Sequence, residues 1–332
     1  MSGLLEGLFA AWLFILGISV GSFLNVVIAR VPEGLSIVRP RSRCPRCGHM
    51  LAWYENVPLV SWLALRARCR SCRAPISWRY PAVELLTGLL FLACLNRFGW
   101  TFELALGLMF VTLLVPLSFI DLEHWILPFS LTLPGTVAGL ALSAPLGSER
   151  LVDALVGAAV GFLALRLMEF VGWVIFKKEA LGGGDKFLVA LLGAFLTWKA
   201  LLGIIFLSSL QGALVGGLLL LTTGRAGPAP QQEAPEPPTE EPAPTMSWAF
   251  LAPGVPLWRR LVLLPYSLLL QPIPDEPTDV QTGEEVEWVP GATNIPFGPW
   301  LALAGLEIML LGPWLAEVLP EPLQLLVAGP LS

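Results

Sequence analysis

The sequence is poor in charge. Only 14% of its 332 residues are Asp, Glu, Lys or Arg, whereas about a quarter is usual in soluble globular proteins. Hydrophobic residues make up 55%, and the mean hydropathy is +0.71. So much apolar surface cannot be hidden in one water-soluble core, but segments of about 20 apolar residues suit a bilayer. The composition excludes an ordinary soluble globule and predicts a membrane protein.

Common hydrolase and nucleotide-binding motifs are also missing. His49 and His124 are the only histidines, and neither belongs to an H-E-x-x-H motif or accompanies a Ser or Cys nucleophile motif. The chain has no Gly-rich nucleotide-binding fingerprint. Intramembrane charges are few and no internal repeat is evident, which argues against a transporter built from inverted repeats. Serine-protease, metalloprotease and transporter hypotheses therefore find no support.

Long apolar runs organise most of the chain. The N-terminal segment lacks the positive region and small-residue cleavage site of a secretory signal, so we expect a retained first helix. Apolar runs predict eight spanning helices, of which the second and sixth are short. Their expected ranges are 5–28, 82–97, 101–120, 130–147, 152–176, 187–198, 200–222 and 296–317.

Positive charge is concentrated between Arg30 and Arg79. This loop holds ten of the twenty basic residues and only two acids, so the positive-inside rule places it in the cytoplasm. An even number of helices then puts both termini outside. The segments around Asp121 and Asp185, and the stretch 223–295, share the cytoplasmic side.

A polar stretch interrupts the apolar pattern before the last helix. Residues 225–247 are rich in Pro, Glu and Ala, which is typical of a disordered linker. Residues 248–270 are apolar but broken by prolines and two arginines. We favour an interfacial or re-entrant segment there, because arginines are costly at depth. A true span would invert the last helix.

Four of the five cysteines form two C-x-x-C pairs, Cys44 with Cys47 and Cys69 with Cys72, separated by 21 residues. Two such knuckles supply four thiolates, the tetrahedral set of a structural zinc site. Neighbouring arginines would offset its negative charge. A reducing cytoplasm favours metal over disulfides. Unmetallated reduced pairs and a redox switch are the alternatives, with His49 as an alternative ligand.

Two aspartates stand where apolar helices meet the cytoplasmic side. Asp121 ends an apolar run, and Asp185 follows three glycines, 182–184, just before the expected sixth helix. A carboxylate at a membrane boundary is costly to desolvate and is a functional candidate. Two neighbouring carboxylates can share a proton, so that one activates water while the other polarises the scissile carbonyl. The alternative is a pair of loop acids at the headgroup level.

Three other acids lie within expected helices. Glu84 is close to the basic loop, where we expect an arginine partner. Glu169 is three residues from Arg166, which places both on one helical face as an ion pair. Glu307 has no obvious partner in the sequence.

These features resemble those of type IV prepilin peptidases, the bifunctional leader peptidases and N-methyltransferases of pilus and type II secretion systems. The resemblance covers residues 1–222 and 294–310. Besides the two aspartate segments, it rests on 21–27 (GSFLNVV), 40–49 (PRSRCPRCGH), 53–58 (WYENVP), 79–88 (RYPAVELLTG) and 295–299 (IPFGP).

The resemblance implies an intramembrane aspartyl protease of the GxGD type, with Asp121 and Asp185 as catalytic residues. It cuts type IV prepilins or pseudopilins after a glycine that precedes a hydrophobic helix. The new amino terminus is then methylated with S-adenosylmethionine. That step is tied to the cysteine-bearing loop, where Glu55 and Asn56 are our candidates for assisting it. Prepilin-like substrates and lipids are the implied partners, without nucleic acid, at the bacterial inner membrane with a cytoplasm-facing site.

The expected fold is therefore an all-α polytopic membrane protein of about eight transmembrane helices, with a small cytoplasmic loop domain in which four cysteines bind zinc. The expected parts are a first helix (1–28), the basic loop (29–81), the peptidase core (82–222), an insert (223–294) and a last helix with the C-terminus (295–332).

Three departures from the family pattern stand out. Phe129 occupies a position where an acid is common, Lys186 follows Asp185 directly rather than after one residue, and residues 225–293 are an insert. Two rival hypotheses remain. One is a peptidase without methylation, which the cysteine-bearing loop argues against. The other is a non-enzymatic scaffold whose zinc loop recruits partners.

Overall fold

The computed structural model describes residues 3–176, 182–224, 256, 294–321 and 324. The linker expected at 225–247, the segment at 248–270 apart from Pro256, and nearly all of the insert lie outside these residues. Within the described parts, the regular structure is helical, with two isolated β-bridges. The all-α fold expected from the sequence is confirmed.

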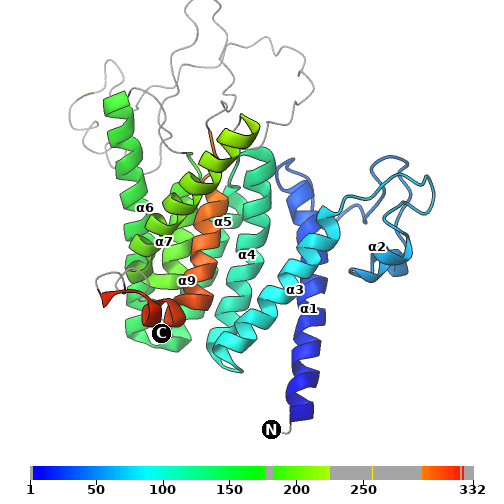
Figure 1. Ribbon diagram of the computed structural model, residues 1–332, viewed down its shortest axis with the longest axis horizontal. Helices are drawn as coiled ribbons and strands as arrows, with labels where there is room; N and C mark the ends of the chain where they lie inside the picture. The colour runs from blue at the N-terminus through cyan, green and yellow to red at the C-terminus, as the bar shows by residue number, and fades with distance from the viewer. Residues whose placement is uncertain (1–2, 177–181, 225–255, 257–293, 322–323, 325–332) are drawn as a thin grey trace, which may run out of the picture.

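Seven of the described helices are long and apolar enough to cross a membrane, and they form one bundle in Figure 1. They are α1 (Gly3–Arg30), α3 (Arg79–Phe98), α4 (Phe102–His124), α5 (Phe129–Ser143), α6 (Ser148–Phe176), α7 (Asp185–Thr223) and α9 (Gly298–Val318). The chain is therefore a multi-pass membrane protein.

Helix α7 combines the expected sixth and seventh spans. Thr197 inside it has non-helical dihedral angles, φ 65° and ψ 173°, so two helical segments meet there. The first segment runs antiparallel to α6, because Lys186 binds Glu169 near one end and Lys199 binds Asp153 near the other. The eight expected spans thus correspond to seven helices, because α7 holds two helical segments that meet at Thr197.

The hydrophobic core is centred on α4, which contacts α1, α3, α5 and α9. Its side chains Leu106, Phe110, Leu114 and Leu117 are fully buried. Many leucines on the outer faces of the helices are exposed instead. A helix that is apolar on every side needs either protein or lipid around it, so the exposed leucines mark the lipid-facing surface.

Close backbone approach holds α6 against α7. A Cβ added to Gly193 would collide with the carbonyl oxygen of Gly157, so only glycine fits at this contact. Small residues at helix contacts allow this approach, which supplies the packing that holds membrane helices together.

The cysteine-bearing loop packs beside α1 and α3 at the right of Figure 1. It contains η1 (Trp53–Asn56) and α2 (Val60–Ala64). Glu84 of α3 accepts a hydrogen bond from the backbone N–H of Leu59 at 2.7 Å. The expected arginine partner of Glu84 was wrong. The N–H just before α2 takes that place because the loop folds down onto the helix.

Candidate active site

Asp121 lies in the last turn of α4. Its carbonyl accepts the N–H of Trp125, whose left-handed conformation (φ 59°) ends the helix. The side chain is buried, with 6% exposure. Its Oδ2 accepts a hydrogen bond from the backbone N–H of Gly298, the first residue of α9, at 3.0 Å. Two helices far apart in sequence therefore meet at this carboxylate.

Asp185 is the first residue of α7. Its N–H donates to the carbonyl oxygen of Gly182 at 3.1 Å, so the glycine run forms a tight turn directly before the helix. The side chain is buried, with 5% exposure. A helix N-terminus carries a partial positive charge that stabilises a nearby carboxylate, which explains why an acid is tolerated at this buried position.

Leu127 joins the two aspartate segments. A Cβ added to Gly184 would lie 2.7 Å from Leu127 Cβ, and one added to Gly298 would lie 3.2 Å from Leu127 Cδ2. The carboxylates of Asp121 and Asp185 are close enough to interact electrostatically. The structure thus brings together the two aspartates that the sequence singled out, at the end of the bundle where α4 ends and α7 and α9 begin.

A buried ionic cluster includes Lys186, the residue that directly follows Asp185. Lys186 Nζ is 2.9 Å from both carboxylate oxygens of Glu169, and Arg166 Nη1 is 2.9 Å from Oε2 of the same residue. The expected pairing of Arg166 with Glu169 is confirmed. Because Glu169 also binds Lys186, the unusual lysine is held by α6.

Phe129, a second unusual residue near the aspartates, takes part in aromatic packing. Phe129, the departure from the resemblance noted above, lies edge-on to Phe187, with ring centroids 4.9 Å apart. Phe187 follows Lys186 on the first turn of α7. A hydrophobic contact between α5 and α7 therefore replaces a charge beside the site.

The four cysteines of the C-x-x-C pairs converge on one point. Their sulfur atoms all lie within 4.8 Å of one another. The Sγ atoms of Cys44 and Cys72 are 3.8 Å apart, and those of Cys47 and Cys69 are 3.9 Å apart. A tetrahedral zinc site with Zn–S bonds of about 2.3 Å has sulfur–sulfur edges of about 3.8 Å. The donor set and its spacing fit a tetrahedral metal ion.

The two knuckles share one local backbone geometry. Gly48 N–H donates to the carbonyl of Cys44 at 2.9 Å, and Arg73 N–H donates to that of Cys69 at 3.0 Å. Gly48 and Arg73 both have a positive φ, 71° and 61°. Because an arginine takes the place of the glycine, this local repeat is not evident from the residues alone.

Glu55 is buried between the knuckles. Its Oε2 accepts the backbone N–H of Ala52 at 2.8 Å and lies 3.2 Å from His49 Nε2. The N–H of Ala52 holds the pKa of the Glu55 carboxyl below its ordinary value, and His49 and Arg70 act in the same direction. Asn56 is exposed. His49 thus binds Glu55, and the cysteines form a four-thiol cluster without it.

The structure separates the two candidate regions. The cysteine cluster, Glu55 and Asn56 lie in the loop beside α3, whereas Asp121 and Asp185 belong to α4 and α7 within the bundle (Figure 1). Sequence reasoning gave Gly298 no role, although its N–H binds Asp121. The only feature of the sequence that pointed to Gly298 was its place in the 295–299 motif. Nearly every residue has a backbone N–H, so the residue type does not reveal which one will act as a donor.

Comparison with known proteins places these features in a family. Residues 15–98 match the profile of the Bacterial Peptidase A24 N-terminal domain, and residues 108–217 match that of the Type IV leader peptidase family. A prepilin leader peptidase/N-methyltransferase of Myxococcus xanthus (strain DK1622) is 65% identical over 329 residues, covering 99% of this chain and 98% of that protein. The chain belongs to the type IV leader peptidase family.

Other members of the type IV leader peptidase family are more distant. Proteins with the same name from Aeromonas hydrophila and Neisseria gonorrhoeae are 43% and 37% identical over 244 and 235 residues. These alignments cover 65% and 64% of this chain, and 83% and 82% of those proteins. The Myxococcus relative, in contrast, aligns over nearly the whole chain and so includes the 223–294 insert. No solved structure was found to match the chain.

Proposed function

We propose that this chain is a membrane-embedded aspartic endopeptidase that removes the leader of type IV prepilins or pseudopilins at the cytoplasmic face of the inner membrane. The proposal rests on one observation above all. Two buried aspartates from different helices, Asp121 and Asp185, lie together at one end of an apolar bundle. The names of the relatives identify the substrate class.

The geometry suits general acid–base hydrolysis of a peptide. One carboxylate takes a proton from water as the water attacks, while the other, protonated, donates to the carbonyl oxygen of the scissile bond. Gly298 N–H fixes Oδ2 of Asp121, which leaves Oδ1 for water or substrate. A Cβ added to Gly183 would meet nothing within 4 Å, so the turn beside Asp185 leaves room for an extended peptide.

The sidedness of the site follows from charge. Arg79, at the end of the basic loop, bonds Glu123 on α4, two residues from Asp121. The loop and the aspartates therefore lie at the same end of the bundle. The positive-inside rule assigns that end to the cytoplasm, where a substrate leader would be.

The second proposed activity is N-methylation of the newly exposed amino terminus with S-adenosylmethionine, in line with the relatives' names. Cys44, Cys47, Cys69 and Cys72 would hold a zinc ion, which supplies a rigid cross-link between the two knuckles. Glu55 binds Ala52 and His49 through Oε2, and Glu55 and Asn56 are our candidates for assisting methylation. Asn56 is exposed and free to meet a ligand.

The test is a cleavage assay in membranes on a model prepilin, with Asp121→Asn and Asp185→Asn compared with wild type. Asp153→Asn is the matched control, because Asp153 binds Lys199 and Trp198 at the opposite end of the bundle. We expect both site variants to lose cleavage, because each removes one of the two proton-transferring groups. The control should cut normally.

Mass spectrometry of the product terminus separates the hypotheses. Cleavage with the added mass of one methyl group establishes both activities. Cleavage without it leaves a peptidase alone. Normal processing by either Asn variant would exclude the aspartate pair. If folded wild type cuts nothing, the scaffold hypothesis takes its place.

A further inference from the structure

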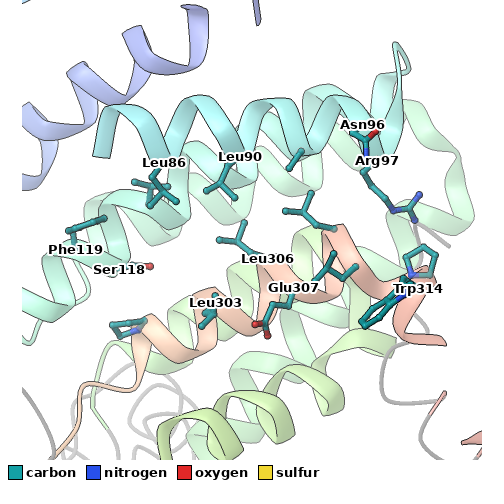
Figure 2. A pocket seen from close by; sticks show the side chains of 16 residues that line it. Leu86, Leu90, Asn96, Arg97, Ser118, Phe119, Leu303, Leu306, Glu307 and Trp314 are labelled. Carbon is teal, nitrogen blue, oxygen red and sulfur yellow. The ribbon is translucent and has the colours of Figure 1, made fainter. Parts of the chain in front are cut away.

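A long cavity of about 660 Å³ lies between α3, α4 and α9. Figure 2 shows α3 along one wall and α9 along the other. The lining is mainly apolar and includes Leu86 and Leu90 on α3 and Leu303 and Leu306 on α9. We call this cavity the lateral groove. No role is assigned to it by the proposed chemistry at the aspartates.

One end of the lateral groove lies within one turn of Asp121 on α4, although neither aspartate is among its lining residues. Ser118 and Phe119 of its lining belong to the turn of α4 that leads into Asp121. Pro299, also in the lining, directly follows Gly298, which hydrogen-bonds to Asp121. A chain that leaves the catalytic carboxylates along α9 therefore enters the groove immediately.

The groove extends along most of the membrane depth. The α9 residues at its two ends, Pro299 and Trp314, are about 22 Å apart along the helix axis, compared with about 30 Å for a hydrocarbon core. Trp314 and Arg97 line the far end. Trp and Arg are typical of membrane interfaces. The groove thus connects the site with the opposite interface.

The carboxylate of Glu307, midway along the groove, already has a hydrogen-bond donor within the protein. Glu307 is the one acid among the lining residues, and its Oε2 accepts a hydrogen bond from Gln211 of α7 at 2.5 Å. The rest of the lining is mainly leucine and other apolar residues, and its other polar residues are Asn96, Arg97 and Ser118. An apolar occupant therefore meets an apolar surface without leaving this carboxylate unpaired.

We propose that the lateral groove receives the apolar membrane helix of the substrate, the segment that directly follows the scissile bond. A chain crossing lipid must satisfy its own backbone hydrogen bonds, which requires a helix. A helix is about 10 Å across, so over this length it exceeds the cavity volume. The groove holds one face of it and leaves the other to lipid. This inference rests on the proposed function.

Photo-crosslinking tests the position of that helix. A photoreactive phenylalanine analogue is placed at Leu86 or Leu303, which are 40% and 41% exposed. The matched control is Leu163 on α6, a 50% exposed leucine away from the groove. Each is built into Asp185→Asn protein, so that bound prepilin is not cut, and is irradiated in membranes with full-length model prepilin.

We expect prepilin adducts from Leu86 and Leu303, mapping to the substrate's apolar helix, at least tenfold above those from Leu163. Equal adducts from all three positions, or adducts with lipid alone, overturn the proposal. Cleavage of the same prepilin by wild-type protein is measured in parallel. If the wild-type protein does not cleave the prepilin, the proposed peptidase function is contradicted. If it cleaves but no adducts form in the groove, only the proposed role of the groove is contradicted.

Narrowing the groove gives a second measurement. Leu86→Trp and Leu303→Trp fill it, and the exposure of both positions means that the buried core need not be rebuilt. We expect kcat/KM for full-length prepilin to fall at least tenfold, mainly through KM, while Leu163→Trp keeps the wild-type value. Wild-type kinetics in both groove variants would contradict the assignment.

Discussion

At the scale of single residues, backbone groups and buried charges shape the aspartate site as much as the aspartates do. Gly298 donates its N–H to Asp121, and Glu169 holds Lys186 next to Asp185. The unusual position of Lys186 is therefore compensated by an acid on α6. Replacing Glu169 would remove the carboxylate that binds buried Lys186, which is costly in a low-dielectric interior.

Gly298→Ala tests the backbone contact. The new Cβ would lie 2.5 Å from Asp121 Oδ2, so the carboxylate must move from its position. Misplacing a reacting group by about 1 Å can cost about a hundredfold in rate, and we expect a loss of that size in the prepilin cleavage assay. Gly217→Ala is the control, since its Cβ would meet nothing within 4 Å. Equal rates for both variants would show that Gly298 has no positioning role.

At the scale of elements, short segments with unusual backbone geometry position the residues of both candidate sites. The turn before Asp185, the break at Thr197 and the paired knuckles each depend on a few residues. The knuckles bring four sulfurs within metal-binding distance although 21 residues separate the pairs. The cysteine-bearing loop can thus be cross-linked by the metal ion that we propose for it, and we expect its stability to depend on that metal.

Metal binding in this loop should depend on pH. Backbone N–H groups of Cys47 and Arg46 lower the pKa of Cys44 to about 7. Zinc requires thiolates, so protons compete for this ligand as the pH falls through that value. We expect zinc affinity, measured by chelator competition on the detergent-purified protein, to weaken on acidification.

Substitution of the ligands completes that measurement. Cys44→Ser with Cys69→Ser should abolish bound zinc and make the loop sensitive to proteolysis. Cys94→Ser should retain the metal, because Cys94 is buried in α3. An unchanged metal content in the double variant would refute the assignment.

At the scale of the whole molecule, the bundle has one polar end and one apolar body. The end of α4 and the starts of α7 and α9 gather at the polar end, at the top of Figure 1, and the loop between α1 and α3 lies at the right of the bundle. The aspartates lie at that end within the bundle, and the lateral groove leads from them into the membrane. Under this proposal, substrate recognition is divided between an aqueous end and a lipid-facing side.

The orientation of this arrangement can be measured with reporter insertions. A reporter active only in the cytoplasm should function in the 29–81 loop, because its ten basic residues resist translocation. It should be silent when inserted at Gly147, in the connection between α5 and α6. Activity at Gly147 and silence in the loop would invert the topology and place the aspartates outside.

Much of this architecture could be predicted from the sequence. Apolar length fixed the spans to within a few residues, because a bilayer demands about 20 apolar residues whatever the neighbours are. The cysteine spacing predicted a metal-binding set. The cost of burying acids, together with the glycine run, the shared cytoplasmic side and the family resemblance, singled out Asp121 and Asp185. Each of these inferences depends on local composition, which the chain carries directly.

Only the tertiary structure decided which distant groups meet. Gly298 reaches Asp121 across 177 positions, and Leu59 rather than an arginine satisfies Glu84. The lateral groove is lined by residues of α3, α4 and α9, which lie far apart in the sequence. Such contacts depend on helix packing and on backbone donors common to nearly all residues. The sequence by itself therefore determined the spans and the candidate chemistry, and packing decided their partners and the path toward the site.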